Sequence, residues 1–260
     1  MNDSNEYAGK VVLVTGGTRG IGRGIAEAFL ARGAQVAICG RRAPEQPIQT
    51  GGSEAVFFQA DVRDSEQIGV LVGQLAERFG RLDILINNAG GSPHVMAADA
   101  SPRFHEAIIR LNLIAPLDLA QRANALMQAQ DGGGVIIFIG SVSALRPSPG
   151  TAAYGAAKAG VLNLVRSLAV EWAPKVRVVA LSPGLVLTEE SHQHYGDEEG
   201  IAAVAKTVPL GRLALPQDIA AACLFLASPA AAYVAGSNLV VDGGGERPAF
   251  LDAANAEQRA

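Results

Sequence analysis

The sequence contains only two cysteines in 260 residues, Cys39 and Cys223, and no long apolar run. Two cysteines are too few for a disulfide framework and lack the spacing of metal ligands, so we expect a reducing compartment and two small buried side chains. No segment reaches the roughly 18 uninterrupted apolar residues of a membrane span, and residues 1–10 lack a signal-peptide pattern. We therefore expect a soluble cytoplasmic protein with no membrane partner.

Clusters of like charge are also missing. The net charge is −4 at pH 7 and no stretch is rich in lysine and arginine, which argues against nucleic acid as a partner. A small-molecule substrate is the expected partner instead. Apolar residues make up 49% of the chain, and no segment has the composition of a linker. We therefore expect a single domain over residues 1–260 with a substantial core.

Short apolar runs alternate with longer segments of helical period along most of the chain. The runs are apolar on successive residues, as in strands that are covered on both faces. We predict strands at Val11–Val14, Val36–Cys39, Val56–Phe58, Ile84–Ile86, Val135–Ile139, Val176–Ala180 and Leu239–Val241. We predict helices at Gly20–Arg32, Ser65–Phe79, Pro102–Met127, Ala152–Trp172 and Gln217–Leu226. The alternation predicts an α/β fold, a Rossmann-type doubly wound parallel sheet of about seven strands with helices on both faces.

Two segments break the alternation. Residues 42–53 contain two prolines and two glycines, so the helix expected between the second and third strands is short or replaced by a loop. Residues 189–208, after the sixth strand, are polar and uneven. We predict that they form an insertion over the carboxyl edge of the sheet, a substrate lid at about residues 188–208. A C-terminal tail is expected from about residue 246.

A glycine-rich segment follows the first predicted strand directly and opens the first predicted helix. Its sequence is Thr15-Gly16-Gly17-Thr18-Arg19-Gly20-Ile21-Gly22. Glycines let the chain turn sharply there, and they let a phosphate approach backbone N–H groups at the positive end of the helix. The spacing G-x-x-x-G-x-G differs from the G-x-G-x-x-G dinucleotide motif, and a plain tight turn is the alternative. The position between a strand and a helix favours a nucleotide site.

The end of the second predicted strand indicates which nucleotide binds. NAD sites carry an acidic residue there for the ribose 2′-hydroxyl, whereas an arginine accommodates the 2′-phosphate of NADP. This chain has Gly40-Arg41-Arg42 with no carboxylate, and Arg19 can add a second positive charge. We therefore predict NADP(H) as the cofactor, with NAD(H) less favoured. The alternative, solvated surface arginines, suits Arg42 better than Arg41.

Tyr154 and Lys158 stand at positions i and i+4 of a predicted helix and share one of its faces. A free tyrosine titrates at about 10, and a nearby cation lowers that pKa toward the range useful for proton transfer. A Tyr-x-x-x-Lys pair alone is common by chance, and an exposed helical pair is the alternative.

Taken together, these motifs resemble those of the short-chain dehydrogenase/reductase family along nearly the whole chain. In order, the matches are Thr15-Gly16-(x)3-Gly20-Ile21-Gly22, Asp61-Val62, Asn87-Asn88-Ala89-Gly90, Asn112, Ser141, Tyr154-(x)3-Lys158, Pro183-Gly184 and Asp242-Gly243-Gly244. The glycine spacing and the length are similar to the compact one-domain branch rather than the longer epimerase branch. The resemblance implies an NAD(P)-dependent oxidoreductase acting on CH–OH or C=O groups. It also implies a homotetramer, because the family packs long apolar helices such as 102–127 and 152–172 across two-fold axes.

The resemblance assigns four catalytic residues, Asn112, Ser141, Tyr154 and Lys158. Tyr154 would deliver a proton to the substrate oxygen, and Ser141 would help to stabilise the negative charge that grows there. Lys158 would lower the tyrosine pKa and bind the nicotinamide ribose, and Asn112 would hold a water that relays protons to Lys158. Ser143 is the competing candidate for the serine and is ranked second, as a substrate contact.

The resemblance also assigns cofactor contacts. Asp61 and Val62 would flank the adenine, residues 87–90 would lie beside the ribose, and Val186 and Thr188 would hold the nicotinamide carboxamide. The full set is Gly16, Thr18, Arg19, Gly20, Ile21, Gly22, Arg41, Asp61, Val62, Asn88, Ala89, Gly90, Tyr154, Lys158, Pro183, Gly184, Val186 and Thr188.

Only the residues expected around the mouth of the site indicate a substrate. They are apolar, namely Val95, Leu145, Leu185 and Leu187. They favour a hydrophobic ketone or secondary alcohol, either cyclic or an acyl thioester. His94 and Met96 are further candidates for substrate contact, with a plain surface loop as the equal alternative.

Two other functions were weighed against this one. A dinucleotide-sensing binding protein of the same fold would be expected to lack Tyr154 or Lys158, and here all four catalytic positions are filled. A methyltransferase on a similar sheet would leave that pair unexplained. We also predict no metal site, because nothing completes the His-x-His pair in the polar segment that holds His192, His194, Asp197, Glu198 and Glu199.

Overall fold

The computed structural model describes residues 5–254. Within this range one sheet of seven parallel strands has the order β5, β2, β1, β6, β7, β8, β9. The strands are β1 (Val11–Thr15), β2 (Gln35–Gly40), β5 (Val56–Gln59), β6 (Ile84–Asn87), β7 (Gly134–Ile139), β8 (Val176–Pro183) and β9 (Asn238–Val241). The predicted doubly wound parallel sheet is confirmed, with each predicted strand present.

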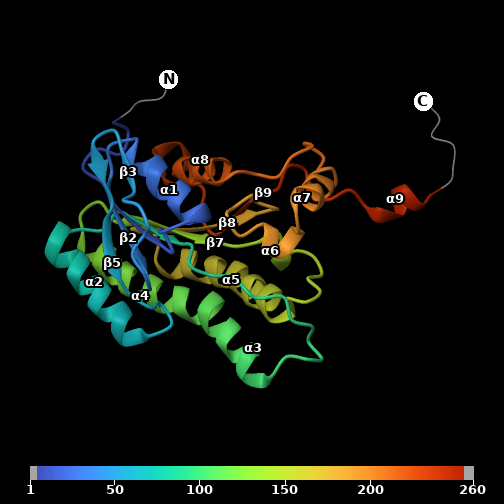
Figure 1. Cartoon of the computed structure of the whole chain (residues 1–260). Coiled ribbons are helices and arrows are strands. Elements are labelled where there is room, and N and C mark those ends of the chain that lie inside the picture. The colour runs from blue at the N-terminus through green and yellow to red at the C-terminus, as the bar shows by residue number, and fades with distance from the viewer. Residues whose placement is uncertain (1–4, 255–260) are drawn as a thin grey trace.

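Helices cover both faces of the sheet (Figure 1). On one face lie α1 (Gly20–Leu30) and α8 (Pro216–Ala227), and on the other lie α2 (Ser65–Phe79), α4 (Ala115–Ala129) and α5 (Ala152–Glu171). In β1, Val12 and Val14 pack into the core under α1 and α8, whereas Val11 and Leu13 pack into the core under the other three helices. All four side chains are fully buried, which explains why this strand is apolar on successive residues.

The strand order reverses at β1. The chain runs outward from β1 to β2 and β5, and then returns to β6 on the other side of β1. In parallel α/β sheets such a reversal leaves a crevice at the carboxyl ends of the strands, where ligands bind. At that edge the neighbouring strands end at Thr15, Gly40, Asn87, Ile139 and Pro183. Most of the predicted cofactor residues and Ser141 follow these strand ends or the end of β5, whereas Asn112, Tyr154 and Lys158 lie on helical segments.

One predicted helix is not uniform. The segment predicted as a helix at Pro102–Met127 consists of α3 (Pro102–Ile109), a π-helical turn at Arg110–Ile114, and α4. Asn112 lies in this turn, and its Nδ2 donates to the carbonyl oxygen of Ile108 at 2.9 Å. Turns of this kind are common at functional sites. The apolar period runs through the segment unchanged, so the sequence did not reveal it.

The loop predicted for residues 42–53 is confirmed. No helix forms there; instead β3 (Gln49–Thr50) and β4 (Ser53–Glu54) pair antiparallel. Gly51 and Gly52 join them with φ angles of +61° and +84°, in the left-handed region that glycine adopts without strain.

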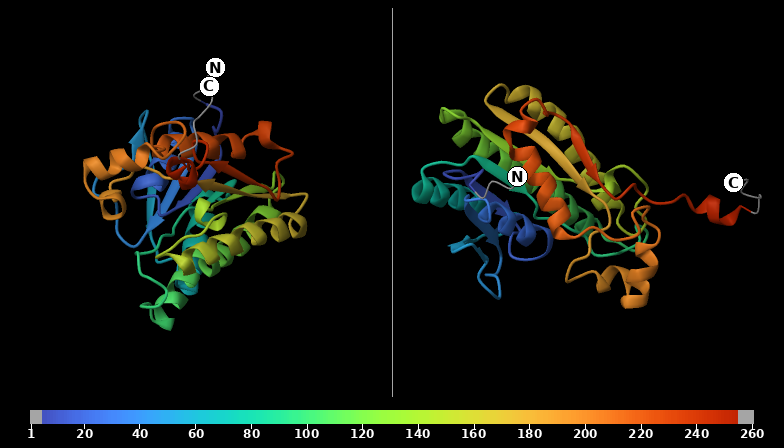
Figure 2. Two further views of the ribbon diagram at one scale, coloured as in Figure 1. Left: turned by 90° about the vertical axis from the view of Figure 1, so that its right-hand side faces the viewer. Right: turned by 90° about the horizontal axis from the view of Figure 1, so that it is seen from above.

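Two segments lie beyond the carboxyl edge of the sheet, the predicted lid and the C-terminal tail. Within the predicted lid, α6 (His192–Tyr195) and α7 (Glu198–Ala205) form after β8. Short 3₁₀ turns follow β7 at Val142–Ala144 and α8 at Pro229–Ala231. The tail after β9 ends in α9 (Ala249–Ala253), which projects away from the body in both Figure 1 and Figure 2. Among the described residues no helix is both long and apolar enough to cross a membrane.

Candidate active site

The glycine loop between β1 and α1 packs too closely for side chains. Gly16 and Gly20 have φ angles of +61° and +52°. A Cβ on Gly22 would lie 2.2 Å from the carbonyl oxygen of Gly16 and 2.6 Å from Nδ2 of Asn88. The backbone conformation and the close packing therefore require glycine at these positions, as predicted for a loop that approaches a phosphate.

The N-terminus of α1 is suited to an anion. No side chain caps it, so its first N–H groups have no side-chain acceptor and carry the positive end of the helix dipole. Gly16 and Gly20 beside it have positive φ angles and no side chain, so a ligand can approach their backbone closely. This arrangement fits the pyrophosphate of a dinucleotide.

Thr15 fastens the glycine loop to the segment after β6. Its Oγ1 accepts the N–H groups of Asn88 and Ala89, both at 2.9 Å. Asn88 returns a hydrogen bond from Nδ2 to the carbonyl oxygen of Thr15 at 2.8 Å. Thr15 is 2% exposed, so water does not compete for these bonds. Two predicted cofactor segments are thereby held in one fixed arrangement.

Arg19 has a partner that the sequence did not reveal. Its Nη1 lies 2.5 Å from Oε1 of Glu190, which belongs to the lid segment. A Cβ on Gly20 would lie 3.6 Å from Cγ2 of Thr188, so the lid begins beside the glycine loop. Thr188 itself donates its N–H to Oγ of the buried Ser191 at 2.8 Å. The ion pair therefore joins the predicted nucleotide loop to the predicted lid.

At the far end of this edge, Arg41 and Asp61 lie within electrostatic reach of each other. The pKa of Asp61 is lowered mainly by its hydrogen bond with Arg63, and the charge of Arg41 lowers it further. Gln59 holds the backbone at this point, because its Nε2 donates to the carbonyl oxygen of Arg41 at 3.2 Å. A Cβ on Gly40 would lie 3.3 Å from Cγ2 of Thr18. Residues 40 and 41 therefore border the same space as the glycine loop and the predicted adenine contact.

The predicted catalytic side chains converge between β7 and α5. Ser141 caps the 3₁₀ turn after β7, and its hydroxyl also hydrogen-bonds the phenol of Tyr154. Nζ of Lys158 lies 5.6 Å from the centre of the Tyr154 ring and donates to the carbonyl oxygen of Ile139 at 2.7 Å. The bond to the phenol favours Ser141 over Ser143, which instead donates its N–H to Oγ of Ser141 at 3.1 Å.

The pKa of Tyr154 differs from the expectation. It is raised above its usual value of 10, because burial disfavours the phenolate more than the Ser141 hydrogen bond favours it. Lys158 was expected to lower this pKa, but it is not among the groups that shift it. Lys158 itself is 4% exposed, and burial lowers its pKa to about 8. Keeping the Lys158 ammonium charged in this buried position therefore costs free energy, and its pKa lies close to neutral pH.

Asn112 fastens the segment after β6 to the π-helical turn. Its Oδ1 accepts the N–H of Gly91 and its Nδ2 donates to the carbonyl oxygen of Gly91, both at 2.9 Å. A Cβ on Gly90 would lie 2.7 Å from Oδ1 of Asn112 and 3.4 Å from Nζ of Lys158. Gly90, Asn112 and Lys158 therefore meet at one point. Both polar ends of the Asn112 side chain have protein partners, and the relay water assigned to this residue stays a prediction.

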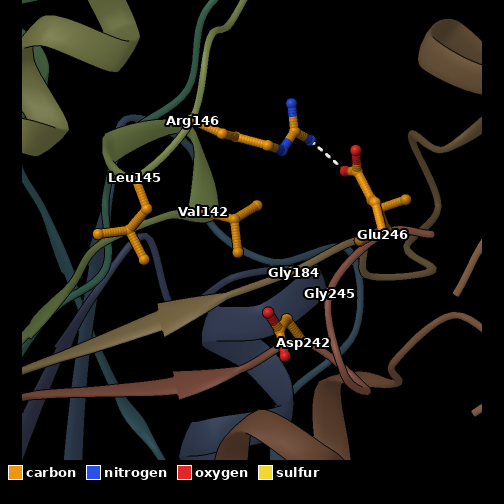
Figure 3. A pocket seen from close by; sticks show the side chains of 8 residues that line it. Val142, Leu145, Arg146, Gly184, Asp242, Gly245 and Glu246 are labelled. Atoms are coloured by element: carbon orange, nitrogen blue, oxygen red, sulfur yellow. Dashed lines mark ion pairs between the residues drawn. The ribbon is translucent and has the colours of Figure 1, made fainter. Parts of the chain in front are cut away.

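A cavity of about 190 Å³ lies next to this cluster, between the turn after β7 and the ends of β8 and β9 (Figure 3). Its apolar lining residues are Val142, Leu145 and Leu185, and its charged lining residues are Arg146, Asp242 and Glu246. Leu145 and Leu185 were expected at the mouth of the site, whereas Val95 and Leu187 are not among the lining residues. The backbone N–H of Val95 instead donates to the carbonyl oxygen of Gly150 at 2.8 Å.

Gly184 and Leu185, which follow Pro183 at the end of β8, line the opposite side of the cavity. Gly184 donates its N–H to the carbonyl oxygen of Val241 at 2.9 Å, and a Cβ on it would lie 2.8 Å from Cα of Asp242. Val186 follows and forms a bridge with Ala214. Of the predicted nicotinamide contacts, Gly184 lines this cavity, together with Val142 of the turn that follows Ser141.

Comparison with known proteins gives consistent matches over most of the chain. A family model described as enoyl-(acyl carrier protein) reductase matches residues 16–246. D-threitol dehydrogenase of Mycolicibacterium smegmatis is 38% identical, with 91% of this chain and 92% of that protein covered. The 3alpha-hydroxysteroid dehydrogenase of Mediterraneibacter gnavus is 36% identical, with 90% and 96% covered. A solved structure of a short-chain dehydrogenase/reductase family protein matches with a TM-score of 0.82 at 38% identity, over 92% of this chain and 98% of that one.

The chain belongs to the short-chain dehydrogenase/reductase family. The resemblance predicted from the motifs is confirmed. As a member of this family, the protein is an NAD(P)-dependent oxidoreductase that acts on CH–OH groups.

Three charged residues beside this short-chain dehydrogenase site were missed in the sequence. They are Arg63, Glu190 and Glu246, the ion-pair partners of Asp61, Arg19 and Arg146. Arg63 stands two residues after Asp61, a spacing that could have suggested the pair. Glu190 and Glu246 are far from their partners along the chain, so no local pattern signals them. Among the described residues no group of three or more His, Cys, Asp and Glu side chains could hold a metal.

Proposed function

We propose that the protein is an NADP(H)-dependent enzyme that interconverts a hydrophobic ketone and its secondary alcohol. The observation that supports this most directly is the hydrogen-bonded pair of hydroxyls on Ser141 and Tyr154, with Lys158 beneath them and an apolar cavity wall beside them. A nicotinamide dinucleotide, when bound at the carboxyl edge, supplies or accepts the hydride.

The two hydroxyls bind the substrate oxygen and stabilise the charge that develops on it. Tyr154 has a raised pKa and is protonated at neutral pH, so it donates the proton to that oxygen during reduction. During oxidation the phenolate of Tyr154 accepts the proton of the substrate hydroxyl. Lys158, with a pKa of about 8, exchanges its own proton near neutrality and can pass it along the same path. Asn112 positions Gly90 and Gly91 beside the amine.

The residues that would hold the dinucleotide are those predicted along the carboxyl edge. The glycine loop Gly16, Thr18, Gly20, Ile21 and Gly22 would bind the pyrophosphate, with Asn88, Ala89 and Gly90 beside it. Asp61 and Val62 would contact the adenine. Pro183, Gly184, Val186 and Thr188 would contact the nicotinamide, and Tyr154 and Lys158 its ribose.

The NADP preference rests on Arg41. A 2′-phosphate needs cationic donors, and the guanidinium forms charge-assisted bonds to phosphate oxygens. Arg19 contributes less than expected, because Glu190 already neutralises it. Titration with both reduced cofactors should show that NADPH binds about tenfold more tightly than NADH, as one charge-assisted contact provides. The double variant Gly40→Asp, Arg41→Ala should bind NADH more tightly than NADPH.

We further propose a homotetramer in the cytoplasm, with a small molecule as substrate and no nucleic-acid or membrane partner. Val170 on α5 is 81% exposed and Ile114 before α4 is 44% exposed, so the two long helices present apolar side chains to solvent. Packing against a second copy would cover them. Light scattering at micromolar concentration should give four times the mass of the chain, and a monomer would contradict this.

An absorbance assay of cofactor oxidation with a panel of ketones, acyl thioesters and alcohols tests the activity. Turnover of a ketone with NADPH is expected. If the protein binds the dinucleotide tightly but turns over no substrate in either direction, it is a dinucleotide-sensing binding protein instead.

A further inference from the structure

An ion pair lies at one end of the cavity between the turn after β7 and the ends of β8 and β9. Nη2 of Arg146, from the segment after the 3₁₀ turn, lies 2.5 Å from Oε1 of Glu246, from the segment after β9. Figure 3 shows the two side chains reaching toward each other across the cavity, with Asp242 on the opposite side and Val142 and Leu145 beside them. The pair therefore links the loop of the predicted catalytic serine to the C-terminal tail.

The charges that line the cavity do not balance. Among the described residues that line it, Arg146 is the only cation, and Asp242 and Glu246 are carboxylates. Glu246 matches the charge of Arg146, and Oδ1 of Asp242 accepts the N–H of Gly244 at 3.1 Å. The lining therefore carries one excess negative charge. An anionic substrate group would meet like charge there, which costs binding free energy.

A neutral hydroxyl group meets no such cost. It can donate to either carboxylate and accept from the guanidinium, because a hydroxyl has one donor and two acceptor lone pairs. Tyr195 of α6 lies within electrostatic reach of both Arg146 and Glu246 but is not among the residues that line the cavity. Two segments far apart in the sequence thus bring polar groups to one end of a cavity whose other wall is apolar.

We propose that the Arg146–Glu246 pair and Asp242 determine substrate specificity, selecting ketones and alcohols whose end remote from the reacting carbon is neutral and hydroxylated. Substrates with an anionic end are disfavoured. The cavity of about 190 Å³ is smaller than the roughly 300–1,000 Å³ of sites for drug-sized ligands, so the part of the substrate that it holds is small. This inference rests on the proposed function, because it places the reacting carbonyl at Tyr154.

Two ligands with the same ring test the proposal, 4-hydroxy-4-methylcyclohexanone and 1-methyl-4-oxocyclohexanecarboxylate. Their dissociation constants are measured calorimetrically with oxidised dinucleotide present, so that the ketones bind but cannot be reduced, and the tertiary hydroxyl cannot be oxidised. The wild-type protein should bind the hydroxyketone more tightly. Glu246→Gln frees Arg146 for an anion and should shift the ratio toward the carboxylate by about threefold, since the two side chains are 37% and 40% exposed and solvent screens the pair.

Glu27→Gln is the matched control, because it breaks the Arg23–Glu27 pair, which joins two side chains that are each 33% exposed on α1, outside the cavity. It should leave the ratio unchanged. The proposal is overturned if the wild type prefers the carboxylate, if Glu246→Gln leaves the ratio unchanged, or if neither ligand binds. A separate assay with reduced dinucleotide tests turnover. Binding in the expected ratio without reduction of either ketone would contradict the proposed function and support the specificity role.

Discussion

The two ends of the site are built in different ways. At the nucleotide end, the glycine loop and the segment after β6 are held by backbone contacts and by hydrogen bonds of Thr15, which is 2% exposed. At the substrate end, half-exposed side chains such as Arg146 and Glu246 join segments from distant parts of the chain. A site that the backbone forms suits the dinucleotide, a ligand that many enzymes share. A site that side chains form can differ from one enzyme to the next, so it can be specific for one substrate. Changes at the nucleotide end should therefore cost stability, and changes at the substrate end should alter selectivity.

The largest effect is expected in the chemical step, where the two ends meet. Tyr154→Phe removes the proposed proton donor and keeps the ring, so kcat should fall by at least about 10²-fold, as for loss of a general acid. Cofactor affinity and thermal stability should stay close to those of the wild type. Tyr233→Phe, at a fully exposed tyrosine, is the control and should retain full turnover. Near-normal kcat in Tyr154→Phe would mean that another group donates the proton.

The nucleotide end should tolerate almost no added volume. Gly22→Ala places a Cβ 2.2 Å from the carbonyl oxygen of Gly16, so it should destabilise the protein by about 1–3 kcal/mol and weaken dinucleotide binding. Gly73→Ala in α2 is the matched control. Nothing lies within 4 Å of its Cβ, and it should stabilise the helix by about 0.5–1 kcal/mol. Thermal unfolding of both variants tests this prediction. Equal melting temperatures for the two variants would show that the glycine loop can adjust to the added Cβ.

The buried amine of Lys158 makes the predicted catalytic cluster sensitive to pH. Its folded pKa of about 8 lies below the ordinary value of 10.5, so the unfolded chain binds more protons between these values. The free energy of unfolding therefore rises as the pH increases from about 8 to 10.5. Burial of the charged amine destabilises the protein most below pH 8. The difference in melting temperature between Lys158→Met and the wild type should change in this window. A constant difference would mean that the pKa of the Lys158 amine is not lowered in the folded protein.

How much the sequence predicts also differs between the two ends. The strands, the glycine loop, the convergence of Ser141, Tyr154 and Lys158, and the loop at 42–53 were predicted, because each depends on local patterns or on motifs in order. The π-helical turn at Asn112 was missed, since it depends on side-chain bonds to Gly91 and Ile108. The raised pKa of Tyr154 was missed because burial arises only from packing.

The smallest effect is expected at the ion pair that joins the glycine loop to the predicted lid. Arg19 and Glu190 have side chains that are 64% and 41% exposed, so their ion pair is weak. Glu190→Gln should free Arg19 for a phosphate and tighten NADPH binding by about two- to fivefold, with NADH binding unchanged. Glu199→Gln, at an exposed residue of α7 in the same lid, should alter neither. An equal gain for both cofactors would indicate that Glu190 acts through the general charge of the site.

Transfer of deuterium tests the central claim most directly. NADPH that carries deuterium at both C4 positions of the nicotinamide is incubated with the wild-type protein and a cyclic ketone that the absorbance assay identifies, and the alcohol is analysed by mass spectrometry. The account predicts one deuterium on the carbinol carbon, and at least about 10²-fold less labelled alcohol when Tyr154→Phe is used for the same time. An alcohol without deuterium, or equal labelling by the variant, would contradict it.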